Sequence, residues 1–273
     1  MPELPEVEVT RRGIDEPLRG ARVITVRVGK PLRWPLGVAP TALVGARVHQ
    51  VSRRGKYLWL EFAAERGGLL MHLGMSGSLA LLVDAGVPGP HDHFEMRTSV
   101  GTLRLTDPRR FGAVVWSPSL AHAPASDLLA RLGPEPFDVA LTVEVFHAAL
   151  RARRSSIKAV LLSGAAIVGA GNIYACEALF TAGIDPRQRA SRLSRPRAAK
   201  LLAAVRGTLS AALDLGGSTL RDFRDAHGVE GGFQRHAAVY DREGQACGNC
   251  GTPIRRVMQA QRSSYFCPLC QRR

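Results

Sequence analysis

Short runs in which apolar side chains alternate with polar ones, or stand next to one another, dominate residues 22–116. The runs are rich in Val, Leu, Phe and Tyr, and Gly and Pro separate them, so they predict β-strands. Several short strands at such spacing favour an antiparallel sandwich over alternating strand–helix units. The clearest runs are Val23–Val28, Tyr57–Phe62, Leu69–Leu73, His93–Thr98 and Leu103–Thr106, the last two joined by a hairpin turn at Ser99–Gly101.

Helical spacing of apolar residues appears on both sides of this β-rich region. Val7, Ile14 and Leu18 predict a helix near the N-terminus. Beyond the proline-rich stretch 132–136, helical spacing returns and continues until the glycines at 216–217. The helices predicted there are Val143–Leu150, Ser155–Leu162, Ile173–Ala182 and Ser194–Leu215, and the charged, glycine-containing segment 221–236 is expected to be a mobile loop.

The cysteines near the C-terminus follow the spacing of a metal site. Cys247 and Cys250 are separated by two residues, sixteen residues follow, and Cys267 and Cys270 repeat the pair. This pattern is typical of a tetrahedral four-cysteine zinc site, and the lack of an export signal disfavours the alternative of disulfides. Because four thiolates leave no position for water, we predict one structural Zn²⁺. The fifth, Cys176, lies in an apolar helical run and is expected in the core.

The residues between the two cysteine pairs predict a β-hairpin. Ile254–Val257 and Ser263–Phe266 would form its strands, and the bend 259–262 would present Arg262 near the tip. The metal would hold this hairpin rigid.

Two other patterns carry weaker signals. His91 and His93 could place two imidazoles on one face of a strand, but no third ligand stands near in sequence. A contact with DNA or with the core is therefore favoured over a metal site. The glycines at 164 and 169 are not followed by the Gly-Lys-Ser/Thr of a nucleotide-binding P-loop.

Basic residues exceed acidic ones by a wide margin. Lys and Arg number 37 against 23 Asp and Glu, a net charge of +14. This balance favours a polyanionic partner, because each neutralised phosphate releases condensed counterions. No apolar run approaches the roughly 18 residues of a membrane span, and the N-terminus carries charges where a signal peptide would be apolar. We therefore expect a cytoplasmic protein without a membrane partner.

The N-terminus offers a nucleophile. Only four of the 37 basic residues are lysines, so few side-chain amines are available. Removal of Met1 would turn Pro2 into a secondary α-amine, and α-amines with an unperturbed pKa of about 8 are partly neutral at pH 7. A neutral secondary amine is a nucleophile, and the adjacent Glu3 carboxyl group could transfer protons. From the terminus alone, an end of the chain that is merely exposed and mobile is the favoured interpretation.

Six separated segments together resemble the formamidopyrimidine-DNA glycosylase family, in the order of that family along the whole chain. They are the N-terminal MPELPEVE, RRGKY at 53–57, HLGMSGS at 72–78, DPRRFG at 107–112, VGAGNIYA at 168–175 and QRSSYFC at 261–267. The resemblance implies an α+β fold with a catalytic β-sandwich domain over 1–135, a helical helix–two-turn–helix domain that binds DNA over 136–236, and a zinc-finger hairpin over 237–273.

Four catalytic residues follow from this resemblance. Pro2 would be the Schiff-base nucleophile and Glu3 the proton donor. Lys56 would donate a proton in β-elimination and bind phosphate, although composition alone favours a solvated basic turn. Arg262 matches the donor in δ-elimination, and because its guanidinium is a reluctant acid, we expect it mainly to neutralise the departing phosphate.

Further residues match the family's contacts to DNA. Extrusion of a base leaves a hole in the duplex. By resemblance, Met75 replaces the base, Phe111 wedges the opposite step, and Arg109 reads the O2 and N3 acceptors of the orphaned cytosine. Without the resemblance, Met75 and Phe111 would be assigned to the core.

The remaining matches concern the DNA backbone and the everted base. Asn172 follows a glycine turn at a helix N-terminus, which favours phosphate. Arg153 and Lys158 belong to a basic run that could also be a solvated face. The full set is His72, His91, Arg153, Lys158 and Asn172 as DNA contacts, with Ser218 and Thr219 opening a loop over the lesion.

We therefore expect a base-excision repair enzyme that releases 8-oxoguanine and formamidopyrimidines from double-stranded DNA, with AP-lyase β,δ-elimination. An endonuclease VIII-like glycosylase for oxidised pyrimidines is one alternative, which Leu4 and the trio Met75, Arg109 and Phe111 disfavour. A non-catalytic zinc protein that binds damaged DNA is the alternative of another class. One chain contains every required part, so we expect a monomer, associated with the nucleoid.

Overall fold

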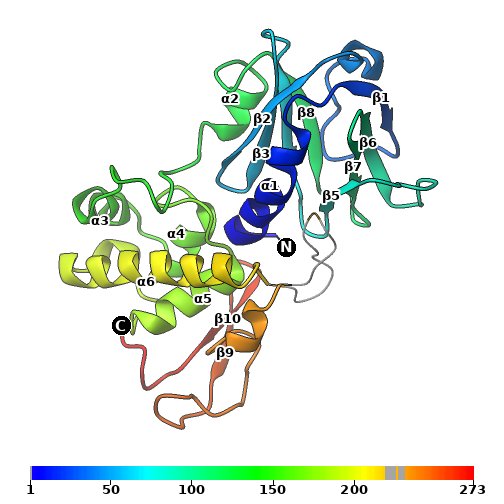
Figure 1. Cartoon of the computed structure of the whole chain (residues 1–273). Coiled ribbons are helices and arrows are strands. Elements are labelled where there is room, and N and C mark those ends of the chain that lie inside the picture. Colours follow the sequence, from blue (N-terminus) through cyan, green and yellow to red (C-terminus); the bar gives the residue numbers. More distant parts are fainter. Residues whose placement is uncertain (1, 219–225, 227–230) are drawn as a thin grey trace. The chain divides into compact units, whose positions relative to one another are not determined.

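The computed structural model describes residues 2–218, 226 and 231–273 (Figure 1). The chain forms two compact units. The first unit comprises Met1–Ala130 with Leu215–Gly232, and the second comprises Arg131–Asp214 with Phe233–Arg273. The predicted helical domain covers 136–236, whereas the described residues 215–218 and 231–232 belong to the first unit. The three-part division of the chain stays a prediction.

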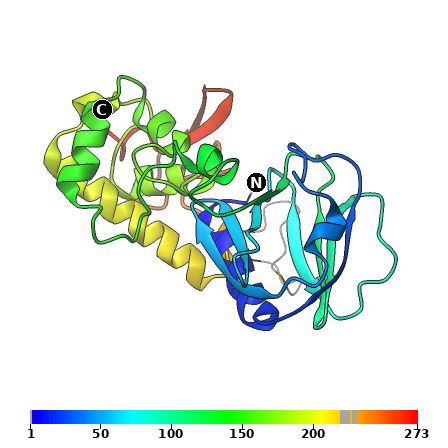
Figure 2. The same cartoon turned by 90° about the horizontal axis from the view of Figure 1, so that it is seen from above.

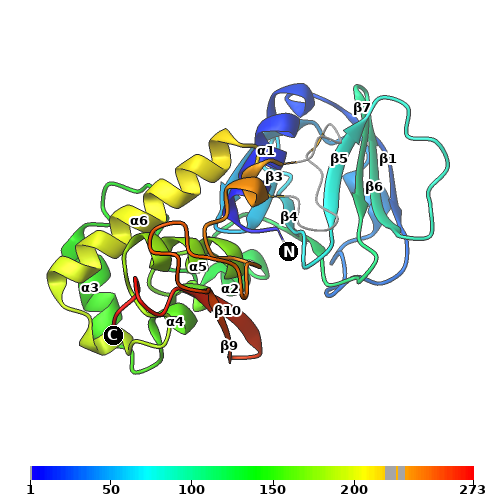
Figure 3. The same ribbon diagram turned by 90° about the horizontal axis from the view of Figure 1, so that it is seen from below.

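Two four-stranded antiparallel sheets build the first unit (Figures 1 and 3). Their strand orders are β1–β6–β7–β5 and β2–β3–β4–β8. Buried side chains of both sheets share one core, which confirms the predicted sandwich. The strands are β1 (Val23–Val28), β2 (Val48–Arg54), β3 (Tyr57–Phe62), β4 (Gly68–His72), β5 (Ser78–Leu82), β6 (Asp92–Thr98), β7 (Gly101–Thr106) and β8 (Ala113–Ser117).

The helix α1 (Leu4–Leu18) closes this core. Its predicted apolar residues Val7, Ile14 and Leu18 are fully buried and pack into the same cluster as the strands. Since these positions recur at helical spacing, one face of α1 is buried while its arginines remain on the other side. A short helix that the sequence did not predict, α2 (Ala125–Leu129), follows β8.

Four helices form the main part of the second unit, which Figure 2 shows from above. They are α3 (Val143–Arg151), α4 (Ile157–Ser163), α5 (Asn172–Thr181) and α6 (Arg195–Asp214), each within a few residues of a predicted helix. Thr142 and Ser156 are the N-caps of α3 and α4, and each side-chain oxygen accepts a hydrogen bond from a backbone N–H of the first turn. In the described part of the chain, 3₁₀ helices lie at Pro40–Leu43 of the first unit and at Ala190–Arg192 and Phe233–His236 of the second.

The C-terminal hairpin consists of β9 (Arg255–Gln259) and β10 (Arg262–Phe266). Ala260 and Gln261 connect the strands with φ of 48° and 59°. Two residues in this left-handed region make the tight turn whose twist matches a hairpin. Arg262 therefore begins β10 directly after the turn, paired with Gln259, and the predicted α+β fold with a C-terminal hairpin is confirmed.

Within residues 2–218, 226 and 231–273, we find no helix with the length and apolar character required to cross a bilayer.

Candidate functional site

The N-terminal motif is buried at the start of α1. Pro2 is buried, and Glu3, 1% exposed, is the N-cap of the helix. A capping box joins Glu3 to Glu6: the Glu3 carboxyl accepts from the Glu6 backbone N–H, and the Glu3 N–H donates to Glu6 Oε2 at 2.7 Å. These reciprocal bonds hold the motif in place, so the alternative of an exposed, mobile terminus does not describe Pro2 and Glu3.

Glu6 also binds the segment that follows α6. Its second oxygen, Oε1, accepts the backbone N–H of Ser218 at 2.7 Å. Gly217 passes so close that a Cβ there would stand 2.9 Å from the same oxygen, and its φ of +82° favours glycine. Glu6 thus links the Pro2 motif to the predicted lesion loop at Ser218, while Thr219 lies outside the described residues. Glu6 was not among the predicted site residues, although its position three residues after the N-cap is a capping-box signal.

Lys56 lies in the tight turn between β2 and β3, next to Gly55 with a φ of +59°. The Arg53 guanidinium donates to the Gly55 carbonyl at 2.9 Å and to Glu8 Oε2 on α1 at 3.0 Å. Burial alone would raise the pKa of Glu8, but hydrogen bonds from three arginines, Arg53 included, leave that pKa lowered. A carboxylate on α1 therefore fixes the turn that carries Lys56.

His72, at the end of β4, is an uncharged imidazole at neutral pH. Burial, with the nearby charges of Lys56 and Arg33, lowers its pKa to about 4. Its Nδ1 accepts the Gly74 backbone N–H at 3.0 Å, so the proton of the neutral ring is on Nε2. The Tyr57 ring packs against it with centroids 4.7 Å apart. His72 can therefore donate one hydrogen bond without carrying charge.

Met75, Arg109 and Phe111 lie on two loops of the first unit that touch. Met75 follows β4, and the other two residues stand between β7 and β8. A Cβ on Gly74 would stand 2.5 Å from the carbonyl carbon of Phe111, so only glycine permits this approach. Phe111 is 45% exposed, with the Arg109 guanidinium 5.0 Å from its ring centroid. Exposure of Phe111 contradicts the alternative of a core residue.

The two histidines around Asp92 have different environments. His91 is exposed in the turn before β6, whereas His93 within β6 is 2% exposed. Among the described residues, the side chains close enough together to hold a metal ion are the four cysteines and do not include these histidines. His93 belongs to the core, and His91 remains available for the predicted contact with DNA.

The turn between α4 and α5 provides a helix N-terminus in the second unit. Gly164 ends α4 with a φ of +72°, and Gly169 has a φ of +99°. Asn172 then begins α5 with Gly171 as N-cap and no acidic residue in the first turn. Asn172 Oδ1 is buried and has no hydrogen-bond partner among the described residues. The first turn of α5 thus contributes no carboxylate to neutralise its positive end, which favours an anion there.

Lys158 does not fit the predicted phosphate contact. Its side chain is 0% exposed, and its Nζ donates to the Ser263 carbonyl at 2.7 Å and to Ser264 Oγ at 2.8 Å. An ammonium enclosed between α4 and β10 is not available to DNA, so this prediction is wrong. Lys158 instead fastens β10 one residue from Arg262. Arg153 remains partly exposed in the second unit.

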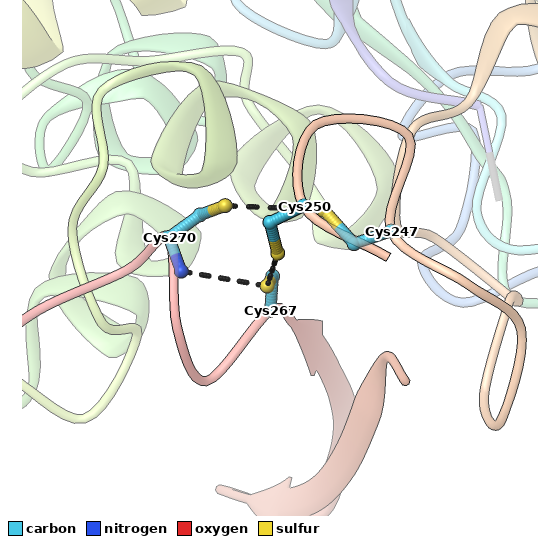
Figure 4. A group of neighbouring side chains, drawn as sticks. All are labelled: Cys247, Cys250, Cys267 and Cys270. Atoms are coloured by element: carbon cyan, nitrogen blue, oxygen red, sulfur yellow. Dashed lines mark hydrogen bonds between the residues drawn. The ribbon is translucent and has the colours of Figure 1, made fainter. Parts of the chain in front are cut away.

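The four cysteines form the predicted metal site (Figure 4). Their sulfurs lie within 4.8 Å of one another, with Cys250 and Cys267 3.5 Å apart and Cys247 and Cys270 3.9 Å apart. A tetrahedral zinc with bonds of about 2.3 Å sets its sulfurs about 3.8 Å apart, so this geometry fits Zn²⁺. Cys176 lies in the apolar cluster beside them, and burial raises the pKa of its thiol.

Family models match all three parts of the chain. The formamidopyrimidine-DNA glycosylase N-terminal domain matches residues 1–114, the H2TH domain of the same enzymes matches 132–224, and a zinc finger found in FPG and IleRS matches 244–273. The formamidopyrimidine-DNA glycosylase of Variovorax paradoxus (strain S110) is 58% identical over 272 residues, covering 100% of both chains. The chain belongs to the formamidopyrimidine-DNA glycosylase family.

Solved structures agree with this membership. The MutM (Fpg) protein of Thermus thermophilus aligns with a TM-score of 0.90 at 39% identity, covering 99% of this chain and 98% of that one. A single-residue mutant of Lactococcus lactis Fpg in complex with a Fapy-dG-containing DNA aligns with a TM-score of 0.90 at 31% identity over 100% of both chains. As a formamidopyrimidine-DNA glycosylase, the protein is a DNA glycosylase and AP lyase with one structural zinc. The non-catalytic alternative is therefore excluded.

Proposed function

We propose that the protein releases oxidised purines, 8-oxoguanine and formamidopyrimidines, from duplex DNA and then cleaves the abasic strand by β,δ-elimination. The observation that carries the proposal is the buried group of Pro2, Glu3, Glu6 and Ser218, in which one carboxylate joins the terminal amine motif to the start of the lesion loop. The lesion in the Lactococcus complex supports the purine substrate class over the oxidised pyrimidines of endonuclease VIII.

The chemistry begins once Met1 is removed. The lone pair of the Pro2 nitrogen forms a bond to C1′, and the glycosidic bond breaks with its electron pair leaving on the base. Glu3 protonates the sugar ring oxygen as the ring opens, and loss of the amine proton leaves a C1′ iminium. Because a secondary amine gives an iminium with no N–H to lose, the cation persists and withdraws electrons from C2′.

Elimination follows from that iminium. Loss of a C2′ proton expels the 3′ phosphate, and a second elimination expels the 5′ phosphate. Lys56, in its turn fixed to α1, binds phosphate and donates a proton in the first step. Arg262, at the start of β10, neutralises the second departing phosphate. The zinc supplies no chemistry, because four thiolates fill its coordination; it holds the hairpin that bears Arg262.

Binding of the duplex rests on both units. Met75 and Phe111 fill the gap left by the extruded base, and Arg109 pairs with the orphaned cytosine. The contacts proposed for the DNA backbone are His72, His91, Arg153 and Asn172, with Ser218 and Thr219 at the lesion. We further propose that the protein acts as a monomer at the nucleoid, since one chain contains every catalytic part and its charge of +14 favours DNA.

Borohydride trapping tests the proposal. Protein freed of Met1, as verified by intact mass, is incubated with a duplex that contains one 8-oxoguanine opposite cytosine. We expect a covalent adduct that maps to Pro2. Absence of an adduct from this des-Met protein would refute the imine mechanism, and faster release of thymine glycol than of 8-oxoguanine would favour the endonuclease VIII-like alternative.

A substitution at the start of α1 tests the acid. Glu3→Gln keeps an oxygen that can accept the Glu6 N–H but removes the proton donor, so excision should slow by roughly 10² to 10⁴-fold. Glu16→Gln makes the same change at an exposed position of α1 and should leave the rate unchanged. Single-turnover release of 8-oxoguanine is the measurement. Equal rates for the two variants would remove Glu3 from the mechanism.

A further inference from the structure

Asp107 is a buried carboxylate at the junction of the loops that bear Met75, Arg109 and Phe111. It directly follows β7 and is 0% exposed. None of the catalytic or DNA-binding roles above uses it. A buried carboxylate persists only where donors compensate its lost hydration, so its partners indicate what it does.

The Asp107 side chain binds both loops at once. Oδ1 accepts the Ser76 hydroxyl at 2.6 Å and the Arg109 backbone N–H at 3.3 Å. Oδ2 accepts the Gly112 backbone N–H at 2.7 Å. Ser76 is the neighbour of Met75, and Gly112 is the neighbour of Phe111. One carboxylate therefore fixes the residue beside each of the two apolar probes.

Its backbone extends the same connection. The Asp107 N–H donates to the His91 carbonyl at 2.8 Å, and its own carbonyl accepts the Arg110 N–H at 3.1 Å. Arg110, between Arg109 and Phe111, adopts a left-handed φ of 56°. This uncommon conformation for a side-chain-bearing residue turns the chain sharply between Arg109 and Phe111, whose side chains meet with the guanidinium 5.0 Å from the ring centroid.

Close backbone packing makes the arrangement discrete. A Cβ on Gly74 would stand 2.5 Å from the Gly112 nitrogen, and one on Gly112 would stand 3.0 Å from Asp107 Oδ2. The backbones of the two loops therefore touch with no side chain between them. A small displacement of one loop toward the other would produce a steric clash, so the loops have one defined relative position. Hydrogen bonds to a carboxylate are the directional element in this contact.

We propose that Asp107 is a positioning residue that locks the Met75 loop and the Arg109–Phe111 loop together, so that the three probe side chains enter the duplex as one rigid unit. The inference rests on the proposed role of these probes in filling the gap left by the extruded base. Ser76 is the second member of the lock, because its hydroxyl joins the Met75 loop to Oδ1 and also accepts the Arg109 N–H at 3.3 Å.

The test separates probe insertion from chemistry. Excision of 8-oxoguanine from a duplex requires the probes, whereas β-elimination at an abasic site in a single-stranded oligonucleotide has no opposite strand or gap to fill. Two variants are compared with wild type. Ser76→Ala deletes the hydroxyl that donates to Asp107 Oδ1 and accepts the Arg109 N–H. Asp107→Asn replaces one acceptor oxygen by an amide NH₂ that cannot accept a backbone N–H.

We expect each variant to slow duplex excision by about tenfold or more, because Asp107→Asn leaves a buried N–H without an acceptor and Ser76→Ala removes a hydrogen bond to a buried carboxylate. Cleavage of the single-stranded abasic substrate should stay within about twofold of wild type, since no probe is needed. When a 2-aminopurine is placed opposite the lesion, its fluorescence should rise less on binding of either variant than on binding of wild type. The reason is that the three probe side chains no longer enter the duplex together and unstack it less.

Asp15→Asn is the matched control. Asp15 Oδ1 accepts the Val51 backbone N–H at 2.6 Å in the same unit but away from the probe loops, so this variant should keep the wild-type ratio of the two activities. Parallel loss of both activities in the Asp107 and Ser76 variants, or no loss of duplex excision, would overturn the proposal. Failure of the proposed function is distinct, because wild type itself would then release no 8-oxoguanine.

Discussion

At the scale of single residues, His72 shows how burial sets chemistry. Burial beside Lys56 and Arg33 keeps its ring neutral, and the Gly74 N–H fixes the tautomer. A neutral imidazole donates from Nε2 to an anion without adding charge, so its bond does not release a condensed counterion. His72 and Lys56 are near each other but would contribute differently to phosphate binding. The histidine offers a directional hydrogen bond without charge, whereas the lysine offers a positive charge.

The stability of the protein should therefore depend on pH through His72. Its folded pKa of about 4 lies below the ordinary histidine value of 6.5, so the unfolded chain binds a proton first as the pH falls. The stability from the neutral ring is present above pH 6.5 and is lost between that pH and 4, by about 2 kcal/mol on going from about pH 7.5 to about pH 5.

His72→Gln tests this linkage. Glutamine offers a carbonyl oxygen to the Gly74 N–H but does not titrate, so its unfolding free energy should decline less steeply with falling pH. Urea unfolding of both proteins at the same two pH values measures the difference, and other titrating groups cancel in the comparison. Parallel declines would show that His72 is not desolvated.

At the scale of elements, the Lys158 ammonium joins α4 to β10. Lys158→Met preserves the length of the side chain but leaves the Ser263 carbonyl and the Ser264 hydroxyl without this donor, so the unfolding free energy should fall by about 1–3 kcal/mol. The yield of the δ-elimination product should fall relative to that of the β-elimination product, because Arg262 is next to Ser263 and loses its fixed position when β10 is no longer bonded to Lys158. End-labelled abasic duplex resolves the two products.

Lys200→Met provides the matching substitution. Lys200 is exposed on α6, in the same unit as Lys158, and its replacement should alter neither stability nor the product ratio. If Lys158→Met lowers stability but leaves the product ratio unchanged, then Lys158 stabilises the fold without positioning Arg262 for δ-elimination.

Elements were more predictable from the sequence than the contacts between them. Hydrophobic periodicity is local, and β1 and β3 have the predicted bounds. Lys158 was predicted to contact DNA, because its partners in β10 are more than a hundred residues away in sequence and leave no local signal. Asp107 and Ser76 likewise meet only through the sandwich topology. Such partners leave no periodic signal, whereas the cysteine pairs were recognisable because their ligand spacing is itself local.

At the scale of the whole molecule, the net charge of +14 should make DNA binding strongly dependent on salt. Arg153→Ala should weaken binding to all sequences and reduce the slope of log K against log salt concentration by about 0.9, the value for one lost phosphate contact. Fluorescence anisotropy at several salt concentrations measures it. Arg66→Ala, an exposed arginine outside the quoted motifs, should leave the slope unchanged.

The capping box at the start of α1 has a consequence for the catalytic cycle. The carboxyl that caps the helix is the one proposed to deliver a proton to the sugar. A carboxylic acid accepts a hydrogen bond less strongly than a carboxylate, so the cap weakens when Glu3 is loaded with its proton and recovers after delivery. The NMR chemical shift of the Glu6 backbone amide should therefore differ between protein with Glu3 protonated and protein with Glu3 ionised.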